Sequence, residues 1–179
     1  MNALATNPSG LRQETQASIM EWKLATFGVS SPIRQMARAT EELGELFRAV
    51  TSDSAPEKIV IEAADVALIL TDIGVLLGTA DWLFGARRPH INRPVRLVTY
   101  TVTQLGLLAH EVEMISSGDA GRSQSMALAS LRAVIGALQE LVDCYGHDLK
   151  LAINAKMAVN RTRKWNLDGT GHGYHRGAV

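Results

Sequence analysis

The amino-acid sequence predicts an all-α protein, a helical bundle of about six helices. Hydrophobic residues make up 46% of its 179 residues but aromatic residues only 5%, and six methionines are present, which suits a helical core better than a sheet. Apolar residues recur at helical spacing in several segments that glycine, proline and serine separate. We expect a single domain over residues 13–165, between flexible tails at 1–12 and 166–179.

Two helices are predicted at the start of this domain. The first covers residues 13–27. The second begins after a Gly-Val-Ser-Ser break, where Ser31 is suited to be the N-cap and Pro32 to be the first helical residue, and it extends to about Val50. The apolar residues on one face of the first helix are Ile19, Trp22, Leu24 and Phe27.

A third helix is predicted over residues 57–77. Asp53 or Ser54 is expected to cap its N-terminus, and Gly78 is expected to end it. This segment is apolar almost all round, which indicates that it is buried in a bundle or in an oligomer. Its apolar run over residues 59–77 is interrupted by Glu62, Asp65 and Asp72, which makes it a poor candidate for a membrane span.

The second half of the domain is also expected to be helical. A Pro- and Arg-rich connection over residues 85–94 is most simply a solvated loop, and the β-branched segment 95–103 is predicted to start a helix because apolar residues continue at helical spacing. Two more helices are expected at about 123–145 and 148–163. His172 and His175, in the Gly-rich tail, are not expected to bind a metal.

Two short segments repeat weakly along the chain. Residues 41–46 (EELGEL) resemble 103–108 (TQLGLL), and 77–81 (LGTAD) resemble 145–149 (YGHDL). Residues 81–145 are therefore either an inserted hairpin or a degenerate second repeat that has lost its carboxylates.

Charge and cysteine content exclude some classes of function. The 18 basic and 18 acidic residues give zero net charge, which argues against a protein that coats a nucleic acid polymer or a membrane surface. The single cysteine fits a reducing compartment, and residues 1–10 show no signal pattern. We expect a cytoplasmic protein, in a bacterial or phage-infected cell.

Two pairs of carboxylates indicate a metal site. Glu42 and Glu45 are three residues apart, as are Glu62 and Asp65, so each pair shares a helix face. If the two helices are antiparallel, the four carboxylates meet and need a cation to neutralise them. Oxygen ligands without histidine or cysteine favour Mg²⁺, for which Mn²⁺ can substitute.

The same acidic residues can also be accounted for without a metal. Pairs of glutamates on helices usually form a solvated face, which suits Glu41 and Glu42. It suits Glu62 and Asp65 poorly, because apolar residues surround them and buried charge is costly unless it is paired or metal-bound. The remaining structural alternative is pairing with a nearby arginine, namely Arg34, Arg38 or Arg48.

A third pattern lies near the C-terminus. Lys156, Asn160 and Arg163 are spaced i, i+4, i+7 and form a polar stripe on the last helix. Such a stripe is suited to bind triphosphate oxygens if it faces the carboxylates. The alternative is an ordinary basic helix end that the helix dipole favours.

Together these motifs resemble the MazG-like all-α nucleoside triphosphate pyrophosphohydrolases, whose superfamily includes dimeric dUTPases and phosphoribosyl-ATP pyrophosphohydrolases. The family signature is EExxE, a spacer and ExxD, which this chain matches at Glu41, Glu42, Glu45, Glu62 and Asp65. The C-terminal K…N…R.W pattern matches Lys156, Asn160, Arg163 and Trp165. The long form most resembles phage-type enzymes that act on purine deoxynucleotides such as dGTP.

The resemblance implies a function and roles for residues. It implies Mg²⁺-dependent hydrolysis of a nucleoside triphosphate to monophosphate and pyrophosphate, by a homo-oligomer such as a dimer or tetramer. Glu42, Glu45, Glu62 and Asp65 would bind the metal, and Glu41 would either support these ligands or help to orient the attacking water. Glu41 and Glu42 would be the catalytic residues. The residues expected to contact the nucleotide are Lys156, Asn160, Arg163 and Trp22.

Several points stay open at this stage. The alternative functions are hydrolysis of phosphoribosyl-ATP or dUTP/dCTP, and a helical interaction protein without catalysis. The insertion at 81–145 leaves undecided whether the last helix completes the site of its own chain or of another subunit. The sequence does not specify the base or the sugar, since Trp22, Ile19 and Asn92 could each be core or loop residues.

Overall fold

The computed structural model confirms the all-α fold. It describes residues 10–81, 83, 86–167, 169, 171 and 173–175, so most of the expected N-terminal tail and His172 lie outside the described residues. The elements are α1 (Gln16–Phe27), α2 (Pro32–Thr51), α3 (Pro56–Ile69), α4 (Thr71–Leu76), α5 (Pro94–Ser116), α6 (Ala120–Asp143), α7 (Leu149–Thr162), β1 (Trp165–Leu167) and β2 (Gly173–His175).

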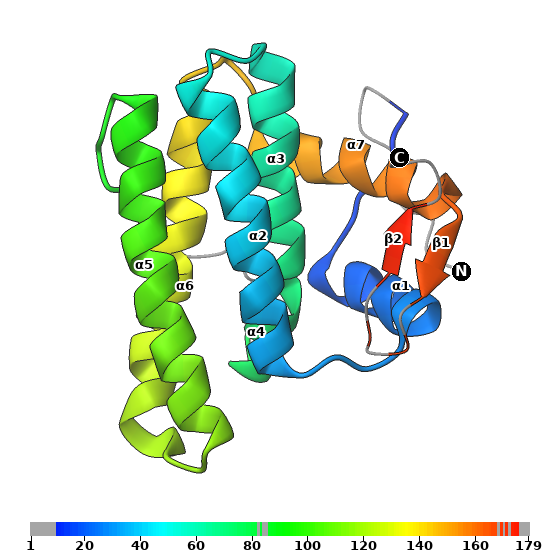
Figure 1. Ribbon diagram of the computed structural model, residues 1–179, viewed down its shortest axis with the longest axis vertical. Helices are drawn as coiled ribbons and strands as arrows, with labels where there is room; N and C mark the ends of the chain where they lie inside the picture. Colours follow the sequence, from blue (N-terminus) through cyan, green and yellow to red (C-terminus); the bar gives the residue numbers. More distant parts are fainter. Residues whose placement is uncertain are drawn as a thin grey trace.

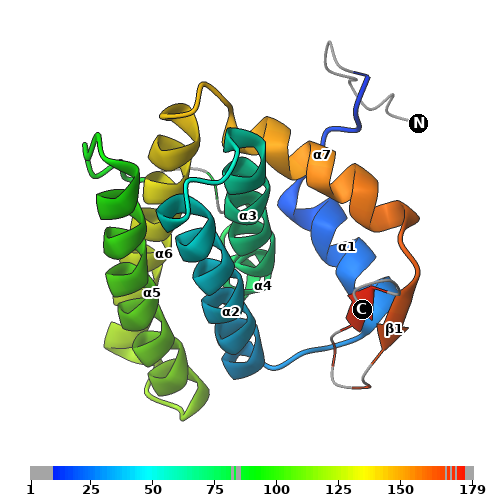
Figure 2. The same ribbon diagram turned by 45° about the horizontal axis from the view of Figure 1, so that its top comes forward.

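The helices form two layers beside a smaller third one. Helices α5 and α6 pack together, and α2 and α3 pack against them (Figure 1). On the opposite side of α2 and α3 lie α1, α7 and the β1–β2 hairpin, as Figure 2 shows from a second direction. This arrangement places the predicted carboxylate helices, α2 and α3, between the α5–α6 pair and the predicted basic helix, α7.

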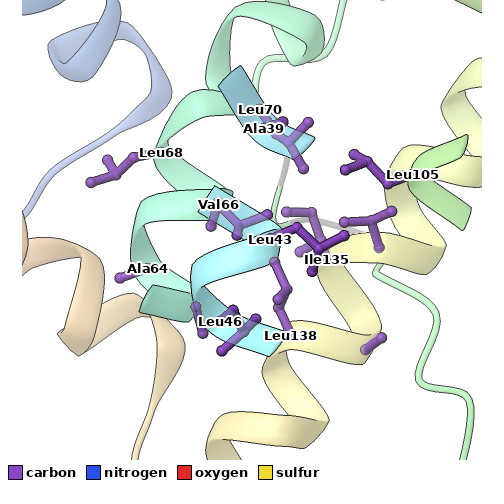
Figure 3. Packing of buried hydrophobic residues seen from close by; sticks show 14 of the residues in the cluster. Ala39, Leu43, Leu46, Ala64, Val66, Leu68, Leu70, Leu105, Ile135 and Leu138 are labelled. Atoms are coloured by element: carbon purple, nitrogen blue, oxygen red, sulfur yellow. The ribbon is translucent and has the colours of Figure 1, made fainter. Parts of the chain in front are cut away.

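The core lies where α2, α3, α5 and α6 meet. Figure 3 shows leucines of α2 packed against α6, with Leu105 of α5 beside them. Leu46, Leu138 and Ile135 are fully buried, and each such side chain contributes about 1.5–3 kcal/mol of hydrophobic stabilisation. Helix α6 is long and apolar enough over residues 123–143 to span a membrane by composition. However, 61% of its most apolar stretch is buried in the bundle, as is typical of a core helix.

Most predicted helix ends are observed. The hydroxyl of Ser31 accepts a hydrogen bond from the backbone N–H of Arg34, so Ser31 caps α2 and Pro32 begins it. The segment 95–103 is helical, and Asp148 caps α7 through the N–H of Leu151.

The third predicted helix differs in two respects. Its N-cap is Ala55 rather than Asp53 or Ser54, because Asp53 has a φ of 56° and belongs to the turn that precedes the helix. The helix also breaks at Leu70, which separates α3 from α4. The carbonyl of Leu68 at this break accepts a hydrogen bond of 3.4 Å from Lys23 of α1, so a contact with a distant helix accompanies the interruption.

The predicted flexible C-terminal tail instead contains an antiparallel hairpin, in which Asn166 pairs with Tyr174. Two glycines let this hairpin approach α1 closely. A Cβ at Gly173 would lie 3.0 Å from the ring of Phe27, and one at Gly171 would lie 2.4 Å from the carbonyl oxygen of Val29. The hairpin packs against distant residues through these two glycines. Such contacts are not visible in the local sequence, so the sequence did not predict the hairpin.

The core bundle consists of two helical hairpins, α2–α3 and α5–α6. Leu43 and Leu105, which correspond in the weak sequence repeat, are both buried. An inserted hairpin and a degenerate repeat both fit this arrangement of residues 81–145. The connection that precedes α5 crosses α6 at Gly136, where a Cβ would lie 2.1 Å from the carbonyl oxygen of Arg87.

Candidate metal and nucleotide site

A pocket of about 360 Å³ lies between the α2–α3 layer and the layer of α1, α7 and the hairpin. Carboxylates of α2 and α3 line one part of it, and aromatic side chains of α1 and β1 line another. Leu68 also lines the pocket, and Figure 3 shows this side chain on the side of α3 turned away from α6. The two sides of α3 therefore serve different purposes, core packing on one and the pocket on the other.

Three of the four predicted metal ligands meet in this pocket. Glu42 of α2 and both Glu62 and Asp65 of α3 each offer a carboxylate oxygen, and these oxygens lie within 4.8 Å of one another. We call these three residues the acidic cluster. They meet because α2 and α3 form an antiparallel hairpin and because three residues make nearly one helical turn. A set of carboxylate oxygens of this kind fits a hard cation such as Mg²⁺ or Mn²⁺.

The other two acidic residues of the motif take different positions. Glu45 lines the pocket, but its carboxylate lies 3.6 Å from the guanidinium of Arg48 and outside the acidic cluster. Glu41 also lines the pocket, with a side chain that is 60% exposed and paired with Arg38. Both positions leave these carboxylates beside the acidic cluster rather than within it.

Two basic side chains already bind the acidic cluster. Arg38 donates to Glu41 at 2.5 Å and to Glu42 at 2.7 Å, and Lys156 donates to Asp65 at 2.5 Å. Glu62 has no ion pair within the described part of the chain. The arginine pairing considered from the sequence for Glu62 and Asp65 is not observed among the described residues, where Arg38 pairs with Glu41 and Glu42 and where Asp65 pairs with Lys156.

Burial and mutual repulsion raise the pKa values of the acidic cluster. The pKa of Glu42 rises to about 7, first because of burial and then because of the charge of Asp65, although Arg38 opposes this shift. Burial likewise raises the pKa of Glu62, with Asp65 and Glu45 adding to it, and burial raises that of Asp65 against the opposing effect of Lys156. A divalent cation would stabilise the ionised form of such carboxylates and would displace their protons.

Metal affinity is therefore expected to increase with pH between about 6 and 8, because a cation must displace the proton of Glu42. The pKa of this group is raised from its ordinary value of 4.5 to about 7 in the folded state, so the metal-free protein should lose stability as pH rises from about 4.5 through 7, with little further loss above. Calorimetric titration with Mn²⁺ at several pH values and thermal unfolding in EDTA measure the two effects. An affinity independent of pH would contradict the assignment of Glu42 as a ligand.

The predicted basic stripe of α7 lines the same pocket of the same chain. Lys156, Asn160 and Arg163 all contribute to its wall, and the guanidinium of Arg163 lies 3.5 Å from the amide oxygen of Asn160. The backbone carbonyl of Asn160 accepts a hydrogen bond from the indole N–H of Trp165. Within one chain, α7 thus brings cations to the carboxylates of α2 and α3.

Three aromatic rings form a second cluster in the pocket wall. Trp22, Phe27 and Trp165 contact one another edge to face, with centroid distances of 5.0–6.1 Å. We call these three residues the aromatic cluster. The guanidinium of Arg161 lies 5.9 Å from the Trp22 ring. Trp22, the predicted nucleotide contact, is thus positioned by neighbours from α1, α7 and β1.

The sequence-based prediction of the site did not include three polar residues that line the pocket, namely Gln35, Lys23 and Arg38. Lys23 forms a partly buried ion pair with Asp72, and burial lowers the pKa of Lys23. The sequence could have predicted Gln35 and Arg38 as pocket residues, because both precede Glu42 at helical spacing on the same face of α2. The Lys23–Asp72 pair joins α1 to α4, and no pattern in the local sequence predicts it because the two residues are far apart in the chain.

Comparison with protein-family models, curated proteins and solved structures found no match. The interpretation of the pocket therefore depends on its residues and their geometry.

Proposed function

We propose that this protein hydrolyses a nucleoside triphosphate to the monophosphate and pyrophosphate in an Mg²⁺-dependent reaction. The observation that supports this most strongly is the acidic cluster in one pocket with two cationic side chains, Lys156 and Arg163, and the aromatic cluster. Carboxylates fit the metal, cations fit phosphates and aromatic rings fit a base. A purine deoxynucleotide such as dGTP is the first substrate to test.

Each part of the pocket has a role in this proposal. The acidic cluster and the adjacent Glu45 hold the cation, which supplies Lewis-acid stabilisation of phosphoryl oxygens and a more acidic bound water. Glu41, next to the cluster, orients the attacking water. Asn160 and Trp22 contact the nucleoside.

The ion pairs suggest how metal and substrate binding are coupled. Arg38 and Lys156 neutralise two carboxylates of the acidic cluster, and both side chains line the pocket. With these carboxylates bound to a cation, Arg38 and Lys156 would become available to the phosphates of the substrate. Metal and nucleotide are then expected to strengthen each other's binding, as linkage requires.

The test is a panel of nucleoside triphosphates and deoxynucleoside triphosphates with Mg²⁺, in which pyrophosphate and orthophosphate are quantified separately. We expect pyrophosphate and a nucleoside monophosphate in equal amounts, and no turnover in EDTA. Release of orthophosphate alone would contradict cleavage at the α-phosphate. Absence of any turnover with the whole panel would favour the non-catalytic interaction protein.

A further inference from the structure

Gln35 is a buried polar residue of the pocket whose side chain lacks a partner within the described part of the chain. It lies in the first turn of α2, is only 5% exposed and lines the pocket. Its backbone N–H donates to Ser31, but no hydrogen bond to its side-chain amide occurs among the described residues. No protein group among the described residues occupies this amide, so its donor and acceptor are available to a group that enters the pocket.

The position of Gln35 indicates which part of a ligand it meets. Gln35, Arg38 and Glu42 follow one another at intervals of three and four residues along one face of α2. At a rise of about 1.5 Å per residue, Gln35 lies about 10 Å along the helix from Glu42. This separation is of the order of that between the phosphates of a nucleotide and its base. When the phosphates lie at the acidic cluster, Gln35 is therefore at the level of the base.

The wall of the pocket also offers surfaces that suit a flat, unsaturated group. Phe27, the last residue of α1, lines the same pocket as Gln35. The hairpin contributes the backbone of Gly173, where a Cβ would lie 3.0 Å from the Phe27 ring. Aromatic walls bind any base through its π-face, so stacking alone selects poorly between bases. Selection requires a hydrogen-bonding group, and Gln35 is suited to provide it.

We propose that Gln35 is the residue that selects the nucleobase, through hydrogen bonds between its amide and the edge of the base. This inference rests on the proposed nucleotide hydrolysis. The amide oxygen accepts an N–H of the base, and the amide nitrogen donates to a neighbouring oxygen or ring nitrogen. This donor–acceptor pair resembles the bidentate contacts that glutamine makes with base edges in nucleic acid recognition.

The first experiment compares the wild-type protein with Gln35→Met, which keeps the length of the side chain and removes both hydrogen bonds. We expect kcat/KM for the preferred nucleotide to fall about 10- to 100-fold and the differences between bases to shrink. The affinity for Mn²⁺ with inorganic tripolyphosphate, measured by calorimetry, should stay unchanged. The matched control is Gln124→Met at an exposed position of α6, which should alter none of these values.

A second measurement needs no variant. The wild-type protein is given the preferred deoxynucleotide and a triphosphate whose base is a nonpolar analogue of the same shape. We expect the analogue to be hydrolysed at least about 10-fold less efficiently, because the amide of Gln35 would then stay unpaired.

The outcomes separate the two proposals. Equal hydrolysis of the natural nucleotide and its nonpolar analogue, or unchanged base preference in folded Gln35→Met, would overturn the role of Gln35 and leave the hydrolase proposal standing. A wild-type protein that neither binds nor hydrolyses any nucleotide would overturn the proposed function and this inference with it.

Discussion

Replacing Glu62 by glutamine is expected to lower Mg²⁺-dependent hydrolysis by about 100-fold or more and to stabilise the metal-free protein. The two effects have the same origin. In the absence of metal, the carboxylate of Glu62 is partly buried beside Asp65 and close to Glu45, and the charges of these two neighbours oppose its ionisation. Glutamine removes this repulsion but also removes a ligand oxygen.

Glu62 is better suited to this test than its neighbours because it has no ion pair among the described residues. Asp65→Asn would also remove a charge, but it would leave Lys156 without its partner. Glu42→Gln would break the contact with Arg38. Neutralising Glu62 therefore tests metal binding without breaking an ion pair of the acidic cluster, whereas neutralising Glu42 or Asp65 would break one.

The measurements for Glu62→Gln are steady-state hydrolysis, Mn²⁺ affinity by calorimetry and the unfolding temperature in EDTA. We expect lower activity, weaker metal binding and a higher unfolding temperature than in the wild-type protein. Glu57→Gln, an exposed position in the first turn of α3, is the matched control and should leave metal binding and activity unchanged. Full hydrolysis by Glu62→Gln would contradict the metal site, and a lower unfolding temperature would favour a structural role.

The contrast between local and distant contacts explains how much of this site the sequence could predict. The meeting of Glu42 with Glu62 and Asp65 was predictable, because helix periodicity fixes each face and a short turn fixes the antiparallel pairing. Whether Glu45 joins them was not, since its side chain can instead reach Arg48 on the same helix. That choice depends on a balance of charges in the folded protein.

Contacts between distant segments could not be predicted in this way, because helix periodicity and short turns do not specify them. Asp65 and Lys156 are 91 residues apart, and only the packing of α7 against α3 shows that they pair. A contact with a distant helix likewise accompanies the break at Leu70, and the β1–β2 hairpin packs against Phe27 at Gly173. The helical fold itself follows from apolar periodicity and from capping residues such as Ser31, which are local properties of the chain.

A second large effect is expected at the ion pair between Glu14, just before the N-cap of α1, and Arg161 of α7. The side chain of Glu14 is 1% exposed, and its carboxylate accepts two hydrogen bonds of 2.9 Å from Arg161 and one of 2.5 Å from Ser18. Arg161→Met would leave this carboxylate buried without its main partner. We expect the free energy of unfolding to fall by about 3–5 kcal/mol, towards the lower value because Arg12 lies 3.7 Å away.

The pH dependence of this loss distinguishes an unpaired charge from simple loss of packing. In the wild-type protein burial tends to raise the pKa of Glu14, but Arg161 and Ser18 together lower it below its ordinary value. The ionised carboxylate therefore stabilises the fold above the unfolded-state pKa, and this contribution is lost as pH falls through the folded-state pKa. Without Arg161, burial raises the pKa of Glu14, so the difference between variant and wild type should be smaller at about pH 4 than at pH 7.

Urea unfolding followed by circular dichroism measures these differences. Glu14→Gln in the Arg161→Met background should recover much of the lost stability, because it replaces the unpaired charge by a neutral amide. The control Arg88→Met removes an exposed pair with Asp143 and should cost at most about 1 kcal/mol. A loss at Arg161 no larger than this would show that the pair contributes little to docking α1 on α7.

The same variant links stability to the pocket. Helix α1 carries Trp22, and the guanidinium of Arg161 lies against that ring. Helix α7 carries Lys156, which contacts the acidic cluster from the other side. Loosening α1 from α7 should displace the aromatic wall while the acidic cluster on α2 and α3 stays in place. We therefore expect Arg161→Met to raise KM for the nucleotide more than it lowers kcat, and to leave Mn²⁺ affinity unchanged.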